Sequence, residues 1–161
     1  KAQAETLVVA SCQRSAIVRT SWVFSPHGAN FVKTMLRLAS QREELGVVAD
    51  QRGRPTAAAD IARTCAVLTQ RLLAEDDRAR GIFHFAGQGD ATWAEFAEAI
   101  FEGARRRGLP AARVRHITTA DYPTPAKRPA NSRLDTSKIE SIGIEPRPWP
   151  VMLEECLDQL S

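Results

Sequence analysis

Two hydroxyls and an indole stand together where a strand is expected to end. Thr20, Ser21 and Trp22 follow a run of β-branched residues, and ligands bind at the carboxyl ends of strands in α/β sheets. Paired hydroxyls beside a large ring suit the face of a sugar or a nicotinamide. A tryptophan packed in the core beside turn residues is the alternative interpretation. The residue types leave both interpretations open.

Cationic side chains gather in two further segments. Residues 51–56 read Gln-Arg-Gly-Arg-Pro-Thr, and residues 127–133 read Lys-Arg-Pro-Ala-Asn-Ser-Arg. The arginine fork can bind phosphate through two hydrogen bonds, and a proline-stiffened loop loses little entropy when it grips an anion. Both segments are therefore candidate diphosphate sites. Solvated basic loops are the alternative.

Metal and cysteine chemistry gain little support from the sequence. The three cysteines lie far apart without a C-x-x-C pair, so we expect them to be free and reduced, and the three histidines are isolated. Glu95, Glu98 and Glu102 are spaced along one helix and could hold magnesium, but such spacing is ordinary on a solvated helix face. We predict no metal ligands.

Composition restricts the partners. The net charge is +3 and the arginines are scattered, which disfavours nucleic acid. No apolar run approaches the roughly 20 residues that span a bilayer, and the first residues lack a secretory pattern. We expect a cytoplasmic protein with neither a nucleic-acid nor a membrane partner.

Apolar periodicity alternates between the helical and the strand period along the chain, which predicts an α/β architecture. Thr56 is the expected cap of one long helix, and Thr92 with Glu95 forms a capping-box pattern at the start of another. The expected helices are 1–11, 30–40, 56–73, 92–107, 135–142 and 149–160, the expected strands 16–24, 45–49, 81–86 and 114–118, and an extended segment 122–129. Residues 1–161 are expected to form one unit.

One motif is missing. The sequence contains no glycine-rich turn of the G-x-G-x-x-G kind, which a dinucleotide-binding fold uses to approach a pyrophosphate. We therefore expect the chain to be part of a larger enzyme.

Six segments in one order resemble the dTDP-4-dehydrorhamnose reductases, a family of extended short-chain dehydrogenase/reductases. The first reads Arg-Thr-Ser-Trp-Val-Phe and the last Trp-Pro-Val-Met-Leu. The segments that carry the resemblance are residues 19–31, 50–56, 81–87, 92–97, 128–136 and 149–153. It implies the carboxyl-terminal half of a Rossmann-like enzyme with its small substrate-binding subdomain.

The resemblance also implies an activity and roles for residues. The activity is hydride transfer from NADPH or NADH to the C4 ketone of dTDP-4-dehydro-L-rhamnose, which gives dTDP-L-rhamnose. Lys1 is similar to the lysine of the family's Y-x-x-x-K pair, which holds the cofactor ribose and lowers the pKa of a tyrosine four residues upstream. Thr20 and Ser21 are expected at the cofactor, and Trp22 at the sugar. The expected nucleotide and diphosphate contacts are Arg54, Arg128, Asn131 and Arg133.

Several alternatives stay open. Family members can use magnesium, and a homodimer is an open expectation. Because the glycine-rich turn and the tyrosine lie outside this sequence, we expect the chain alone to be inactive. A non-catalytic, reductase-like binding or regulatory subunit is the alternative function, and the residues 50–56 and 128–136 disfavour a sugar-nucleotide epimerase.

Overall fold

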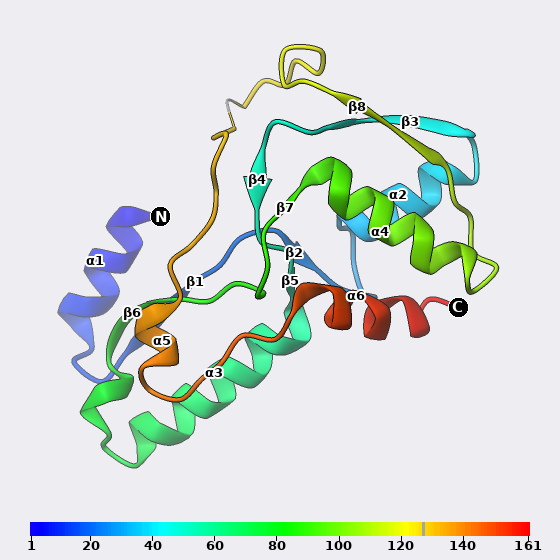
Figure 1. The fold of residues 1–161 in the computed structure, drawn as a ribbon. Helices are drawn as coiled ribbons and strands as arrows, with labels where there is room; N and C mark the ends of the chain where they lie inside the picture. The colour runs from blue at the N-terminus through cyan, green and yellow to red at the C-terminus, as the bar shows by residue number, and fades with distance from the viewer. Residues whose placement is uncertain (127) are drawn as a thin grey trace.

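A computed structural model describes residues 1–126 and 128–161, so Lys127 of the expected basic loop and extended segment lies outside the described residues. Helices and strands alternate along the chain, which confirms the α/β class (Figure 1). The helices are α1 (Ala2–Ser11), α2 (Phe31–Ala39), α3 (Ala58–Leu73), the 3-10 helix η1 (Asp77–Ala79), α4 (Trp93–Arg105), α5 (Ser137–Glu140) and α6 (Trp149–Asp158). The strands are β1 (Ala16–Arg19), β2 (Val23–Phe24), β3 (Glu44–Val48), β4 (Arg52–Gly53), β5 (Thr56–Ala57), β6 (Gly81–His84), β7 (Ala91–Thr92) and β8 (Arg113–Ile117).

The strands associate in pairs. β1 pairs with β6, β2 with β5, and β3 with β8, all in parallel, whereas β4 and β7 are antiparallel. In Figure 1 the two longest pairs, β1–β6 and β3–β8, lie at opposite ends, and the short pairs lie between them. The centre of the molecule is therefore built from short strands and the loops that follow them.

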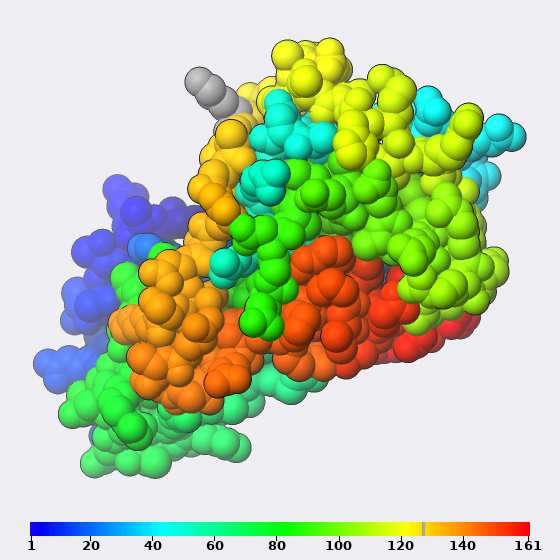
Figure 2. Space-filling model, in the orientation of Figure 1, coloured from blue at the N-terminus to red at the C-terminus, as the bar shows by residue number. Residues whose placement is uncertain are grey.

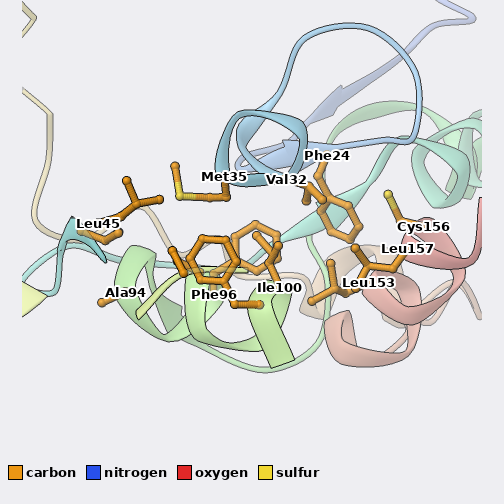
Figure 3. Packing of buried hydrophobic residues seen from close by; sticks show 14 of the residues in the cluster. Phe24, Val32, Met35, Leu45, Ala94, Phe96, Ile100, Leu153, Cys156 and Leu157 are labelled. Atoms are coloured by element: carbon orange, nitrogen blue, oxygen red, sulfur yellow. The ribbon is translucent and has the colours of Figure 1, made fainter. Parts of the chain in front are cut away.

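Two apolar cores hold the helices and strands together. The larger core joins β2, β3, α2, α4 and α6, and Phe24, Val32, Phe96 and Leu157 are fully buried in it (Figure 3). The smaller core lies under β6, where Leu68, Phe83 and Ile139 bring α3 and α5 together. Full burial of one such side chain contributes about 1.5–3 kcal/mol. The cores fix α2, α4 and β3, which surround the site described below.

The expected strand 16–24 is wrong in one respect. It is split into β1 and β2 because Trp22 adopts a φ of 52°, in the left-handed region. This conformation is unusual for a bulky residue and costs about 1–3 kcal/mol, so it persists only where the surrounding structure holds it. The break turns the Trp22 ring out of the regular strand alternation.

Two expectations about α3 are also wrong. Thr56 does not cap the helix, since its hydroxyl donates to the Arg54 carbonyl and accepts from the Gly87 N–H, and Ala57 occupies the cap position. Cys65, expected on the inner face, is exposed. The capping box of α4, by contrast, is confirmed.

Candidate functional site

Two tryptophans stack at the centre of the molecule. The ring centroids of Trp22 and Trp93 are 3.5 Å apart and their planes differ by 7°. Phe31 of α2 packs against Trp93 with its centroid 4.6 Å away. Indole Nε1 of Trp22 donates a hydrogen bond of 2.8 Å to Ser132 Oγ, and the Trp22 carbonyl accepts from the Thr56 N–H at 3.1 Å. These contacts hold the Trp22 backbone in its unusual conformation.

Gly53 lies directly against the Trp22 ring. A Cβ at this position would come within 2.3 Å of indole Cε2, far inside van der Waals contact. A side chain here would therefore displace the indole. Glycine at residue 53 lets β4 approach the stacked pair.

Residues 130–132 run beside β4 like an added strand. The Arg52 N–H donates to the Ala130 carbonyl at 2.8 Å, and the Ser132 N–H donates to the Arg52 carbonyl at 2.9 Å. Figure 2 shows the segment that follows residue 127, in orange, passing over the surface beside β4. The pairing places Ser132 under the Trp22 indole.

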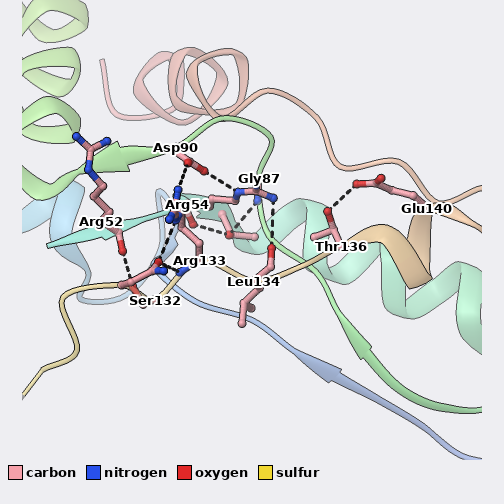
Figure 4. A network of polar contacts seen from close by, with 11 residues as sticks. Arg52, Arg54, Gly87, Asp90, Ser132, Arg133, Leu134, Thr136 and Glu140 are labelled. Atoms are coloured by element: carbon pink, nitrogen blue, oxygen red, sulfur yellow. Dashed lines mark hydrogen bonds and ion pairs between the residues drawn. The ribbon is translucent and has the colours of Figure 1, made fainter.

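Asp90 fixes this added segment a second time (Figure 4). Its carboxylate accepts 2.9 Å from Arg54 Nε and 2.8 Å from an Arg133 guanidinium nitrogen, and Arg54 also donates to the Leu134 carbonyl. The hydrogen bonds from Arg133, and then those from Arg54, hold the pKa of the Asp90 carboxyl below its usual value. We call these two ion pairs the Asp90 clamp. The clamp ties residues 133–134 to the loop that precedes α4.

A large cavity of about 660 Å³ opens beside Trp93, between α2, β3 and the segment after β8. Aromatic and aliphatic side chains form much of its wall, and Gln51, Thr34 and Thr119 add polar groups. Arg42 and Arg128 contribute two cations, while no Asp or Glu lines it among the described residues. Its volume falls within the range of about 300–1,000 Å³ for small-molecule sites. It suits an anion with an apolar or aromatic part.

The structure divides the expected substrate residues between two places. Arg128 lines the large cavity, and Trp22 lies one ring behind Trp93, which does line it. Arg54 and Arg133 face Asp90 and a smaller hollow of about 480 Å³, and Asn131 Oδ1 accepts from the Arg133 N–H and Nε.

The expected cofactor residues lie at β1 and α1. Thr20 is exposed, and the Ser21 hydroxyl is buried without a hydrogen-bond partner among the described residues. Lys1 is exposed at the first turn of α1, and Glu5 of that helix forms a two-bond ion pair with Arg19 of β1 at 3.0 and 2.5 Å. The pair joins the helix of Lys1 to the strand that leads into the two hydroxyls.

Sequence reasoning missed Trp93, Asp90 and Gln51 as site residues. Trp93 and Gln51 lie inside the resembling segments, where their residue types indicate only a helix start and part of a basic loop. Asp90 stands in the segment Gly-Gln-Gly-Asp-Ala, whose residue types give no signal of a pairing with Arg54 or Arg133. Their contacts join residues far apart in the sequence: Asp90 lies 36 positions from Arg54 and 43 from Arg133, and Gln51 lies 68 positions from Thr119.

Residues 1–126 and 128–161 contain no group of three or more His, Cys, Asp or Glu side chains arranged to hold a metal ion. Over the same residues, every helix is too short or too polar to cross a bilayer.

The sequence and the structure were compared with known proteins. The dTDP-4-dehydrorhamnose reductase of Aggregatibacter actinomycetemcomitans is 47% identical over 154 residues, which cover 92% of this chain and 52% of that protein. The enzyme of the same name from Escherichia coli K12 is 40% identical over 152 residues, which cover 92% of this chain and 50% of that protein. The chain thus spans about half the length of the curated relatives it matches.

Solved structures agree with these matches. A dTDP-4-dehydrorhamnose reductase from Clostridium acetobutylicum superposes with a TM-score of 0.88 at 36% identity, covering 99% of this chain and 54% of that one. The Bacillus anthracis enzyme in complex with NADP gives a TM-score of 0.85 at 33% identity, covering 98% and 52%. The expected fold class, part of a Rossmann-like extended short-chain dehydrogenase/reductase, is confirmed. The family described as RmlD substrate binding domain matches residues 1–161, and this chain belongs to it.

Proposed function

We propose that the full-length protein containing this chain reduces the C4 ketone of dTDP-4-dehydro-L-rhamnose with NADPH, and that residues 1–161 act as one unit that binds the substrate. The large cavity supports this most directly. Among the described residues it combines an aromatic wall with two arginines and no lining carboxylate, which suits a base, a sugar and a diphosphate. The curated relatives bear the name of this reductase.

Arg128 is the proposed diphosphate contact, because it is a cation in the cavity wall. Trp22 is proposed to form the end of the site that binds the sugar, and its stack on Trp93, which lines the cavity, supports this role. An indirect role is proposed for Arg54, Asn131 and Arg133, which would hold the segment that begins at Arg128 in place. Arg54 and Arg133 donate to Asp90, and Arg133 also donates to Asn131.

The residues at β1 and α1 fit a nicotinamide cofactor. The Ser21 hydroxyl, which has no partner in residues 1–126 and 128–161, offers a buried polar contact. The exposed Thr20 and Lys1 offer a hydroxyl and a cation to ribose or amide groups. A bound NADPH supplies the hydride. NADH use stays an alternative, and one NADP complex among the solved relatives favours NADPH. Lys1 is proposed to hold the cofactor and to lower the pKa of the tyrosine that protonates the product oxygen.

Magnesium has no role in this proposal, because residues 1–126 and 128–161 contain no group of three or more His, Cys, Asp or Glu side chains that could hold it. A homodimer and a cytoplasmic location remain part of the proposal.

The test is NADPH oxidation by the full-length protein with dTDP-4-dehydro-L-rhamnose as substrate. We expect turnover that requires the sugar nucleotide, a raised KM in Arg128→Ala and a lower kcat/KM in Trp22→Ala. Arg113→Ala, at an exposed arginine of β8 outside the cavity lining, is the matched control for loss of charge. Unchanged kinetics in both site variants would remove these assignments, and an inert protein that still binds dTDP would favour the non-catalytic subunit.

A further inference from the structure

A chain of hydrogen bonds at the wall of the large cavity begins at Asp50. Its carboxylate accepts the Thr119 N–H at 2.9 Å and the Thr119 hydroxyl at 2.7 Å. Both bonds, the backbone one more strongly, hold the pKa of the Asp50 carboxyl below its usual value. Asp50 is therefore ionised near neutral pH, and an ionised carboxylate only accepts hydrogen bonds.

The Thr119 hydroxyl has one proton, which it donates to the Asp50 carboxylate in a hydrogen bond. Its oxygen, 3.0 Å from the Gln51 side chain, can then only accept a hydrogen bond. The atom of Gln51 that faces Thr119 must be the donor, Nε2. This proton count fixes the direction of an amide that otherwise could sit either way round.

The other end of the amide, Oε1, is left as an acceptor. Gln51 is only 6% exposed and both Gln51 and Thr119 line the cavity. Oε1 accepts no hydrogen bond within the described part of the chain. Oε1 is absent from the buried side-chain atoms that lack a partner, so solvent reaches it from the cavity. A ligand that covers it with an N–H replaces that water, whereas a ligand that covers it with a lone pair leaves both acceptors unsatisfied and loses affinity.

Pyrimidine bases differ at this very feature. Thymine and uracil carry a proton on N3, whereas cytosine carries a lone pair there. Phe31 and Trp93 in the same cavity offer aromatic faces on which any of these rings could stack, so stacking alone would not separate them.

We propose that the series Asp50–Thr119–Gln51, called the Thr119 relay, makes the large cavity specific for bases with an N3–H, with Thr119 acting as a positioning residue for Gln51. This inference rests on the proposed function, because it assumes that the cavity holds the base of the nucleotide. Loss or inversion of one such hydrogen bond in a buried site changes affinity roughly ten- to a hundredfold.

The test is calorimetric binding of dTDP, dUDP and dCDP to the full-length protein. The pair dUDP and dCDP separates the N3 proton from the thymine methyl group. We expect the wild type to bind dUDP at least about tenfold more tightly than dCDP. In Thr119→Val the hydroxyl is gone, the Gln51 amide can reverse, and the ratio should fall to within about threefold.

Two further variants serve as controls. Thr119→Ser keeps the hydroxyl and should keep the wild-type ratio. Thr118→Val makes the same chemical change one residue earlier, at a hydroxyl that donates to Asp121 at 2.7 Å and does not line the cavity, so the ratio should also be kept. Circular dichroism verifies that each variant folds.

The outcomes separate the relay from the proposed function. A wild type that turns over the dTDP-sugar but binds dUDP and dCDP equally contradicts the relay and leaves the proposed function standing. This outcome holds whether or not Thr119→Val folds. A folded Thr119→Val with an undiminished ratio, or a Thr119→Ser that loses it, does the same. A protein that binds none of the three nucleotides and oxidises no NADPH overturns both.

Discussion

Replacing Gly53 by alanine should unseat the stacked tryptophans. The new methyl carbon would lie 2.3–2.7 Å from three atoms of the Trp22 ring, whereas carbon atoms rest about 3.5 Å or more apart, so the indole must move by about 1 Å. Such a shift breaks the 2.8 Å bond to Ser132 and opens the 3.5 Å stack on Trp93. The β4 backbone cannot recede to make room, because it is held on both sides, by residues 130–132 and by β7.

The magnitude follows from these losses. The stack contributes about 0.5–1.5 kcal/mol and the hydrogen bond a similar amount. Alanine returns about 0.4–1 kcal/mol by restricting the unfolded chain, since Gly53 does not have a positive φ. We expect Gly53→Ala to lower the free energy of unfolding by about 1–2 kcal/mol, in the range for overpacked sites.

Urea unfolding of the full-length protein measures the stability, and the exciton band of the two stacked indoles in circular dichroism reports the ring geometry. Gly46→Ala of β3 is the matched control, because its Cβ would meet the movable tip of Arg115 at 3.2 Å and methyl groups of Ile117 at 3.4 and 3.5 Å. We expect that control to stay within about 0.5 kcal/mol of wild type with an intact exciton band. A Gly53→Ala protein of wild-type stability and unchanged band would show that the Trp22 ring is not displaced by a methyl group at residue 53.

Three further predictions concern charge and burial. The hydrogen bonds from Arg133 and Arg54 lower the pKa of the Asp90 carboxyl in the folded protein. The Asp90 clamp therefore stabilises the protein above the unfolded-state pKa of this carboxyl, and its contribution is lost as the pH falls through the folded-state pKa. In Asp90→Asn, this decrease should be missing when the free energy of unfolding is measured across an acid titration. Asp60 is 3% exposed and accepts bonds of 2.9 and 2.8 Å from Arg147, so Asp60→Ala should lower the free energy of unfolding by about 2 kcal/mol in urea, less than for a fully buried pair because the Arg147 side chain is 36% exposed. Burial raises the pKa of the Cys156 thiol to about 11, so a thiol reagent at pH 8 should label the two exposed cysteines first and Cys156 only after denaturation. The stability contributed by the protonated thiol should be lost as the pH rises toward 11. Equally fast labelling of all three cysteines would count against the buried position of Cys156.

Local signals predicted the elements well where one rule governs them. The apolar periodicity of residues 30–40 gave α2, and Thr92 with Glu95 gave the capping box of α4, because both depend on residues within one turn of each other. Thr56 looked equally suitable as a cap but bonds to Gly87, 31 residues away. Tertiary contact decided its role, and sequence spacing does not show such contacts.

The site was predictable only in part for the same reason. Trp22 and Arg128 were found by residue type and resemblance, and the structure places both at or one ring behind the large cavity. The partner of Arg54 was not foreseen, since an arginine in a turn suits a phosphate as well as a carboxylate. The orientation of Gln51 depends on a hydroxyl 68 residues away, and only the folded arrangement shows it.

Hydride transfer is the most direct test of the central claim. The full-length protein would be incubated with NADPH deuterated at the transferred position and dTDP-4-dehydro-L-rhamnose, and the product examined by NMR. We expect dTDP-L-rhamnose with one deuterium at C4. Recovered substrate with no deuterium, from a protein that nevertheless binds dTDP, would contradict it.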